Sequence, residues 1–102
     1  MDFLSRARGA LVGLAVGDAL GTTNEFQPAG SFEPITDMVG GGVFGLEPGQ
    51  WTDDTSMALC LADSLLAQGR YDSFDVMERY ERWHSEGYRS STGVCFDIGN
   101  QV

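Results

Sequence analysis

Gln50-Trp51-Thr52-Asp53-Asp54-Thr55 is a polar segment that leads directly into an apolar run of helical periodicity. It places two adjacent carboxylates and two hydroxyls at the predicted start of a helix, and such oxygen ligands suit Mg²⁺, Mn²⁺ or Ca²⁺. The same residues also cap helices: Thr52 can be the N-cap, and Asp53 and Asp54 can complement the helix dipole. Taken alone, the segment is compatible with both interpretations, and capping is the more common one.

The helix that follows this segment is predicted to run from about residue 53 to 68. Its apolar residues recur every three to four positions, at Met57, Ala58, Leu61, Ala62, Leu65 and Leu66. We expect this stripe to face inward. Leu59 and Cys60 lie off the stripe, so little of the helix is polar and it is predicted to be central and buried. Gly69 is placed to end it.

Two further helices are predicted, at about residues 4–20 and 74–86. The first has an apolar face formed by Leu4, Ala7, Leu11, Leu14 and Ala15. The second is expected to be capped by Ser73, to end at Gly87 and to turn Val76, Met77, Tyr80 and Trp83 inward. His84, the single histidine of the chain, is interpreted as a surface or packing residue because no second histidine is near it.

A connecting segment of about 30 residues separates the first two helices. It contains Gly40-Gly41-Gly42 and three prolines, and a connection of this length in a compact domain is usually functional. Strand-like alternation is not sustained anywhere in the sequence. The predicted fold class is therefore all-α, with a long glycine-rich loop between the first and second helices.

Charge and composition exclude several functions. The chain has 102 residues, 42% of them hydrophobic, and a formal net charge of −9. One globular domain at most is expected, and the negative charge argues against nucleic acids and anionic membrane surfaces as partners. The cysteines, Cys60 and Cys95, have no zinc-like spacing, and no signal peptide or membrane span is recognised. A reduced, cytoplasmic location is the expectation.

Four motifs in order resemble the ADP-ribosylglycohydrolases. The first is the glycine-rich helix from Gly9 to Gly21, which ends Gly17-Asp18-Ala19-Leu20-Gly21, followed by Glu25-Phe26. Gly40-Gly41-Gly42 comes next, then Pro48-Gly49-Gln50 with Trp51-Thr52-Asp53-Asp54-Thr55, and finally Phe96-Asp97-Ile98-Gly99-Asn100. The similarity extends over nearly all of the chain. Four motifs in the family's order are much more specific than any one of them.

The resemblance implies an all-α fold with a binuclear Mg²⁺ or Mn²⁺ centre. By similarity, Thr52, Asp53 and Asp54 supply metal ligands, and Glu25 is an acidic residue near the metals. Asp97 is a carboxylate that faces the bond to be broken and contacts substrate, and Asn100 helps to hold the substrate. The implied reaction is hydrolysis of the glycosidic bond that links ADP-ribose to a protein side chain or a related acceptor. Whether Asp97, Asp53 or Glu25 is the base stays open.

Part of the family pattern is missing. The second metal-binding motif, Asp-x-Asp-Thr, and the small-residue phosphate-binding segment have no counterpart in the chain. Residues 1–102 are therefore expected to be the N-terminal portion of a single domain, with half of the metal ligands and no activity alone. The rest of the site would come from a C-terminal segment or a complementing chain. Two alternatives are a non-catalytic remnant that binds ADP-ribose or metal, and a structural interaction fragment.

Overall fold

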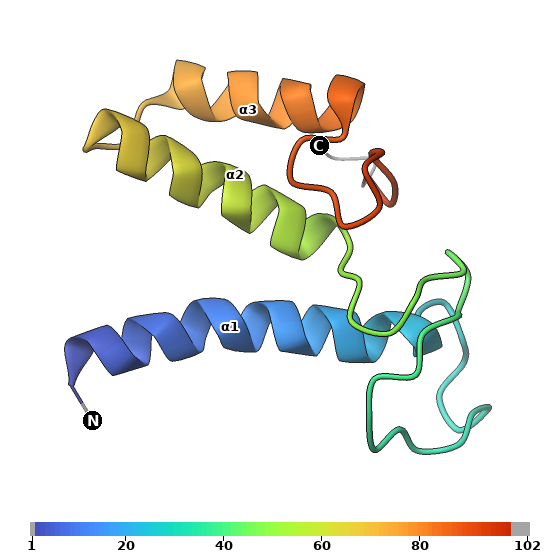
Figure 1. The fold of residues 1–102 in the computed structure, drawn as a ribbon. Coiled ribbons are helices and arrows are strands. Elements are labelled where there is room, and N and C mark those ends of the chain that lie inside the picture. The colour runs from blue at the N-terminus through green and yellow to red at the C-terminus, as the bar shows by residue number, and fades with distance from the viewer. Residues whose placement is uncertain (1, 99–102) are drawn as a thin grey trace. The chain divides into compact units, whose positions relative to one another are not determined.

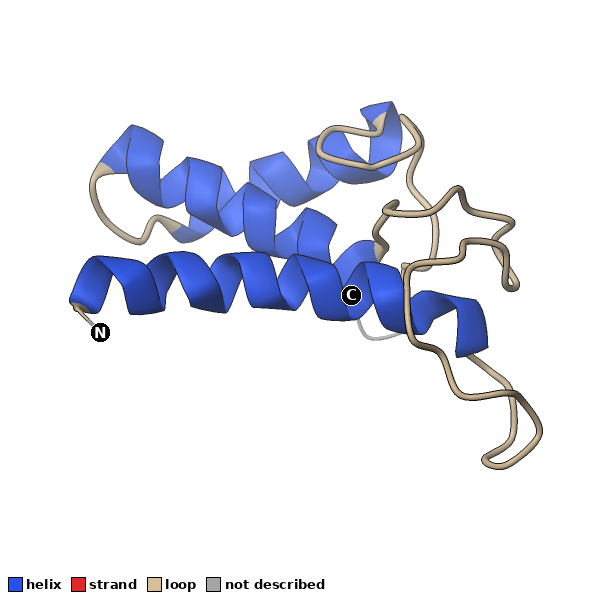
Figure 2. Cartoon of the chain, turned by 60° about the horizontal axis from the view of Figure 1, so that its bottom comes forward, coloured by secondary structure: helices blue, strands red, loops and turns tan. Residues whose placement is uncertain are grey.

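The computed structural model describes residues 2–98 and contains three α-helices and one short 3-10 helix. Helix α1 comprises Phe3–Gly21, η1 Thr22–Asn24, α2 Asp53–Gln68 and α3 Ser73–Glu86 (Figures 1 and 2). The described residues form no β-strand, only an isolated bridge between Gly41 and Leu46. The predicted all-α class is confirmed, and each predicted helix lies within one residue of its observed bounds.

The helix ends follow from local chemistry, with one correction. Gly69 and Gly87 end α2 and α3 in the left-handed conformation, with φ of 69° and 75°, as predicted. Ser73 is not the cap of α3. Asp72 is the N-cap, and its carboxylate accepts hydrogen bonds from the backbone N–H groups of Phe74 and Asp75. An ionised carboxylate accepts such bonds more strongly than a hydroxyl does, so the acidic residue takes the capping position.

The packing of α2 on α3 overturns the predicted inward face of α2. The buried residues of α2 are Thr55, Ser56, Cys60 and Ser64, whereas Leu65 and Leu66 are 42% and 83% exposed. On α3, Val76 and Trp83 are buried as predicted, but Met77 is 62% exposed. Trp83, the largest buried side chain, belongs to α3, whereas the buried side chains of α2 are small. The leucine stripe therefore marks the most apolar face of α2 and not the face that α3 covers.

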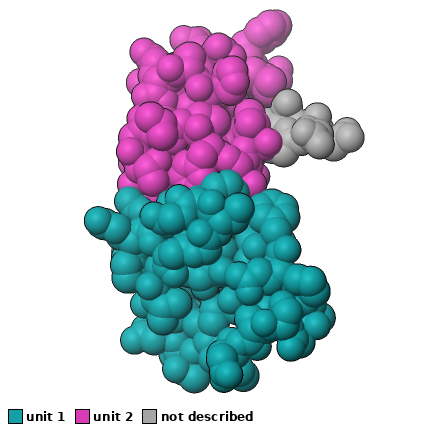
Figure 3. Space-filling view, turned by 90° about the vertical axis from the view of Figure 1, so that its right-hand side faces the viewer, with its two compact units in different colours: residues 1–51 teal, residues 52–102 magenta. Residues whose placement is uncertain are grey.

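The chain divides into two compact units, residues 1–51 and 52–102 (Figure 3). The first holds α1, η1 and the segment that follows, and the second holds α2, α3 and the segment after α3. The predicted apolar face of α1 is not buried, since Leu4, Leu11 and Leu14 are 54%, 41% and 40% exposed. Among the described residues, no helix is long and apolar enough to cross a membrane.

Main-chain contacts organise the glycine-rich segment of the first unit. Gly42, with φ of 73°, lies against η1 so closely that a Cβ there would stand 2.8 Å from the Thr23 Cα. Gly40 is similarly close to the main chain, with the Leu46 carbonyl oxygen 2.6 Å from such a Cβ. These positions require glycine both for the sign of φ and for the close approach. Gly42 therefore brings the segment against the helical turn that precedes Glu25, and Gly40 brings it against the main chain at Leu46.

Candidate functional site

Thr52, Asp53 and Asp54 form the beginning of α2. Thr52 is the N-cap residue, in an extended conformation, and is 2% exposed, while Asp53 and Asp54 occupy the first turn. The Thr52 hydroxyl donates a hydrogen bond of 3.3 Å to Oδ1 of Asp53. Neighbouring oxygen ligands around one divalent cation stand about 3 to 3.5 Å apart, given metal–oxygen distances of about 2.0–2.6 Å. The oxygens of Thr52 and Asp53 fit a hard cation in chemistry and in spacing.

The capping interpretation of this segment holds only in part. Thr52 has the position of an N-cap, and its carbonyl accepts the Ser56 N–H at 3.2 Å, but its side chain makes no capping hydrogen bond. A threonine that served only as a cap would accept a backbone N–H with its hydroxyl. The helix dipole still favours the carboxylates of Asp53 and Asp54 in the first turn. Capping therefore does not account for the buried hydroxyl of Thr52.

Glu25 follows η1 in the first unit and is partly buried. Its carboxylate accepts a hydrogen bond of 3.1 Å from the Thr22 hydroxyl. The next residue, Phe26, has φ of 68°, an uncommon conformation for an aromatic residue, and its ring contacts Phe44 edge-on with centroids 6.3 Å apart. Thr22 is a partner of Glu25 that the sequence did not single out, although the hydroxyl and carboxylate stand three residues apart.

Asp97 lies in the second unit, in the segment that follows α3. It is partly buried and has φ of 58°, a sparsely populated conformation that aspartate tolerates better than most residues. Burial raises the pKa of the nearby Cys95 thiol, and the charge of Asp53 raises it further. The segment that carries Asp97 therefore comes close to the first turn of α2. Asn100, the other predicted substrate-binding residue, lies outside the described residues.

The structure brings some of the predicted site residues together. Thr52, Asp53 and Asp54 share the start of α2, and the segment of Asp97 returns to that region, whereas Glu25 belongs to the other unit. Within residues 2–98, no three His, Cys, Asp or Glu side chains gather into a metal-binding group. The second unit thus offers a pair of neighbouring carboxylates and one hydroxyl to a cation.

A network of charged and polar side chains, which sequence reasoning missed, joins α2, α3 and the segment after α3. Asp63 accepts hydrogen bonds from Nε and Nη2 of Arg89, at 2.6 and 2.8 Å, and from the Tyr88 hydroxyl at 2.6 Å. The hydrogen bond from Arg89 holds the pKa of Asp63 below its ordinary value. Arg79 donates to the Tyr88 hydroxyl and pairs with Asp75. The pair of Asp75 and Arg79 has the i,i+4 spacing of helical ion pairs, but no sequence pattern identifies Arg89 as the partner of Asp63, because the two are 26 residues apart.

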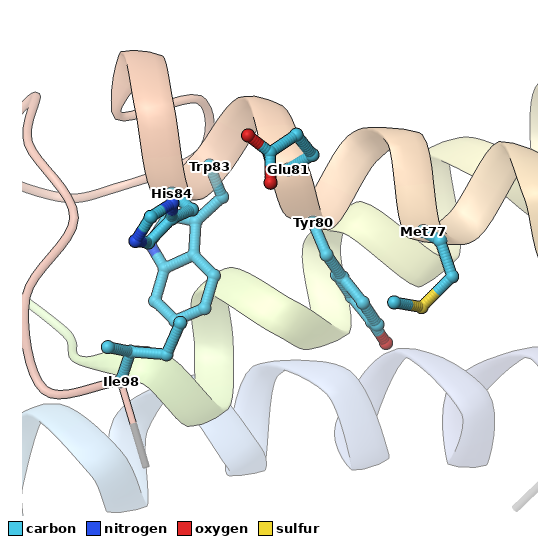
Figure 4. A pocket seen from close by; sticks show the side chains of 6 residues that line it. All are labelled: Met77, Tyr80, Glu81, Trp83, His84 and Ile98. Atoms are coloured by element: carbon cyan, nitrogen blue, oxygen red, sulfur yellow. The ribbon is translucent and has the colours of Figure 1, made fainter. Parts of the chain in front are cut away.

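Each unit also has a cavity of its own. The side chains of Met77, Tyr80, Trp83 and His84 line a cavity of about 310 Å³ with Ile98 (Figure 4). His84 is otherwise exposed, in agreement with its interpretation as a surface residue. In the first unit, a cavity of about 380 Å³ lies between Thr23 and Asn24 of η1 and the segment up to Gly42. The cavity of the first unit borders the turn that precedes Glu25, whereas the cavity of the second unit is lined by none of the predicted site residues.

Comparisons with known proteins identify the family of the chain. The family model for ADP-ribosylglycohydrolase matches residues 1–102. The chain belongs to the ADP-ribosylglycohydrolase family. One relative is the ADP-ribosylarginine hydrolase Tri1 of Serratia proteamaculans, 59% identical over 97% of this chain and 27% of the relative. The ADP-ribosyl-[dinitrogen reductase] glycohydrolase of Rhodospirillum rubrum is 49% identical over 76% of this chain and 28% of the relative.

The fold of the chain also matches a solved structure of the family. That structure, an ADP-ribosylglycohydrolase-related protein complex, is 58% identical with a TM-score of 0.77, over 81% of this chain and 29% of that chain. The 102 residues therefore span between a quarter and a third of the length of the ADP-ribosylglycohydrolases that they match.

Proposed function

We propose that this chain forms part of a hydrolase that cleaves the glycosidic bond between ADP-ribose and a protein side chain or a related acceptor. The observation that carries the proposal is the start of α2, where a buried threonine hydroxyl bonds to Asp53 and makes no capping bond. The family membership supports the same reaction. An arginine linkage is the first substrate to test, because a relative 59% identical is named an ADP-ribosylarginine hydrolase.

Thr52, Asp53 and Asp54 would hold Mg²⁺ or Mn²⁺, with further ligands from residues outside this chain. The chemistry that such a cation would supply is a lowered pKa for a nearby water and electrostatic positioning of the ribose. The few ligands of the second unit bind such an ion weakly when they are alone. The isolated chain is therefore proposed to be inactive and to represent part of one domain.

The chain's own carboxylates have the remaining tasks. Cleavage of the ribosyl bond passes through a transition state with positive charge on the sugar, which a nearby carboxylate stabilises. We propose Asp97 for that role and for contact with the substrate, and Asn100 to hold the substrate. Asp97, Glu25 and Asp53 are the candidates for the base that accepts a proton from water. The partner is an ADP-ribosylated protein or an ADP-ribose-type small molecule.

The test uses a chimera of the Serratia relative in which the matching stretch is replaced by this chain. Release of ADP-ribose from an arginine-modified peptide is measured with Mg²⁺, with Mn²⁺ and after removal of metal, beside a serine-modified peptide. We expect metal-dependent release by the chimera and none by the 102-residue chain alone. An inactive chimera that still binds ADP-ribose would indicate the non-catalytic remnant instead. Turnover by the isolated chain would refute the need for further ligands.

Substitutions at the start of α2 make the same test specific. Asp53→Asn and Asp54→Asn should each abolish most of the chimera's activity. The control Asp37→Asn, in the other unit, should leave activity within about twofold, because a surface substitution far from the proposed ligands changes little. Equal loss in all three variants would contradict the proposed ligands.

A further inference from the structure

The segment after α3 folds back on itself at two glycines. A Cβ at Gly87 would overlap the carbonyl group of Gly93, so the two ends of this turn touch through their main chains. The Ser90 N–H donates to the Gly87 carbonyl at 2.9 Å, and the Ser90 hydroxyl donates to the Val94 carbonyl at 2.5 Å. The turn is thus held together by its own contacts. Its position depends on the residues that attach it to the helices.

Arg89 attaches this turn to α2 at two places. Its carbonyl accepts a hydrogen bond of 3.0 Å from the buried Ser56 hydroxyl, and its guanidinium forms the forked pair with Asp63. Ser56 and Asp63 are seven residues apart and so lie on one side of α2. Arg89 has φ of 63°, which is disfavoured for a residue with a Cβ. These contacts hold Arg89 in that conformation.

Tyr88 and α3 fix the acceptor that Arg89 binds. The Tyr88 hydroxyl donates to the same Asp63 oxygen that accepts Nε of Arg89, and it accepts a hydrogen bond of 3.1 Å from Arg79. The guanidinium of Arg82 lies 4.1 Å from the centre of the Tyr88 ring. The Asp63 carboxylate thus has a fixed orientation between α2 and α3. The planar guanidinium of Arg89 fits this orientation better than the single ammonium group of a lysine would.

The far end of the same segment returns to the start of α2 (Figure 1). Ser56, whose hydroxyl binds the Arg89 carbonyl, lies three residues after Asp53 in α2, and Asp97 follows the turn eight residues after Arg89. We propose that Arg89 is a positioning residue for Asp97: by tying the turn to Ser56 and Asp63, it sets where Asp97 stands relative to Asp53. This inference rests on the proposed function, in which both carboxylates serve one reaction.

The kinetic test compares Arg89→Gln, Arg89→Lys and the control Arg70→Gln in the active chimera. Arg70 pairs with Asp72 at the turn between α2 and α3. The control Arg70→Gln removes one positive charge, as Arg89→Gln does. We expect Arg89→Gln to lower kcat about 10- to 100-fold, because small displacements of a reacting group cost this much. Arg89→Lys should keep only part of the kcat that Arg89→Gln loses, since lysine lacks the planar guanidinium that donates to both oxygens of Asp63. The Mn²⁺ concentration for half-maximal activity should stay within about twofold, because Thr52, Asp53 and Asp54 belong to α2.

A second measurement does not depend on activity. The rate of Cys95 alkylation by iodoacetamide, followed by mass spectrometry, should rise at least about threefold in Arg89→Gln and stay unchanged in Arg70→Gln, since access controls thiol reactivity. The fully buried Cys60 reports global unfolding in the same sample and should not react faster. Acceleration of both cysteines together would reduce Arg89 to a general structural residue and overturn the proposal.

The outcomes separate this inference from the proposed function. If the unmodified chimera releases no ADP-ribose, the proposed function fails, and the alkylation rates still decide whether Arg89 ties the segment. If the chimera is active but Arg89→Gln keeps kcat within about twofold while Cys95 becomes more reactive, Arg89 ties the turn without positioning Asp97, and the inference is wrong.

Discussion

Glu25 and Asp97 are both predicted site carboxylates, yet the two units hold them by different means. In the first unit, the close approach of Gly42 to the main chain of Thr23 supports the helical turn before Glu25. In the second, the segment of Asp97 is attached largely by side chains, above all the pair of Arg89 with Asp63. Where main chains touch, an added Cβ atom has no space and causes strain. A contact between charged side chains can instead lose part of its energy while the main chain stays in place. Substitutions should therefore act abruptly at the main-chain contact of Gly42 and gradually at the side-chain contacts of Arg89.

The largest effect is expected where the second unit also depends on a main-chain contact. Gly87→Ala should lower the free energy of unfolding by about 2–4 kcal/mol, since it combines a positive φ with overlap of the Gly93 carbonyl. Gly69→Ala is the matched control, because Gly69 ends α2 at φ of 69° with open space around it. It should cost only about 1 kcal/mol. Urea unfolding measures both, and equal costs would show that overlap is relieved without strain.

Gly42→Ala tests the main-chain contact of the first unit in the same way. The expected cost is about 2 kcal/mol, because the added Cβ would meet main-chain atoms of Thr23 that cannot rotate away. Gly45→Ala, with φ of 62° and nothing within 4 Å, is the control and should cost about 1 kcal/mol. Hydrogen exchange at the Gly41 N–H, which bonds to the Leu46 carbonyl, reports the local effect. Unchanged protection in Gly42→Ala would contradict this account.

Loss of the side-chain contact should be moderate and dependent on pH. Asp63→Asn should cost about 1–2 kcal/mol at pH 7, at the lower end of what hydrogen bonds to charged groups contribute, because Asp63 is mostly buried but Arg89 is 46% exposed. Because the folded-state pKa of Asp63 is lowered, its contribution is present above the unfolded value of about 3.9 and is lost as pH falls through the folded value. Stability curves between pH 2 and 7 should therefore be flatter in acid for Asp63→Asn than for the unmodified chain.

The pair of Asp75 with Arg79 provides an internal comparison for the acid dependence. The hydrogen bond from Arg79 lowers the pKa of Asp75, with the same sign of effect on stability. Asp75→Asn should flatten the acid limb separately from Asp63→Asn. Acid curves that coincide with that of the unmodified chain in both variants would show that other carboxylates control acid unfolding.

The smallest effect on stability is expected at Thr52. Thr52→Val should change the free energy of unfolding by less than about 1 kcal/mol, since the side chain makes no capping hydrogen bond. In the chimera it should raise the Mn²⁺ concentration for half-maximal activity, and Thr52→Ser should restore it. A larger loss of stability with an unchanged metal response would indicate that Thr52 acts only as a helix cap.

Periodicity and helix-ending residues were sufficient to predict the helices. Apolar spacing located α1, α2 and α3 to within one residue, and Gly69 and Gly87 marked two ends because few other residues adopt a left-handed conformation there. The cap of α3 was assigned one residue too late, at Ser73 in place of Asp72. The apolar stripe of α2 was predicted to face inward, whereas its last two members, Leu65 and Leu66, are exposed. Hydrophobicity identifies apolar faces but not the shape that fits a tryptophan.

Local patterns and the order of the motifs were enough to predict the helical elements, the family and the candidate residues. These candidates are Glu25, Thr52, Asp53, Asp54, Asp97 and Asn100. Only the tertiary structure revealed the burial of the Thr52 hydroxyl, the return of the Cys95 segment to Asp53, and the pairing of Asp63 with Arg89. Those features join residues far apart in the chain. Their energies depend on distance, burial and orientation in space, none of which has a signature along the sequence.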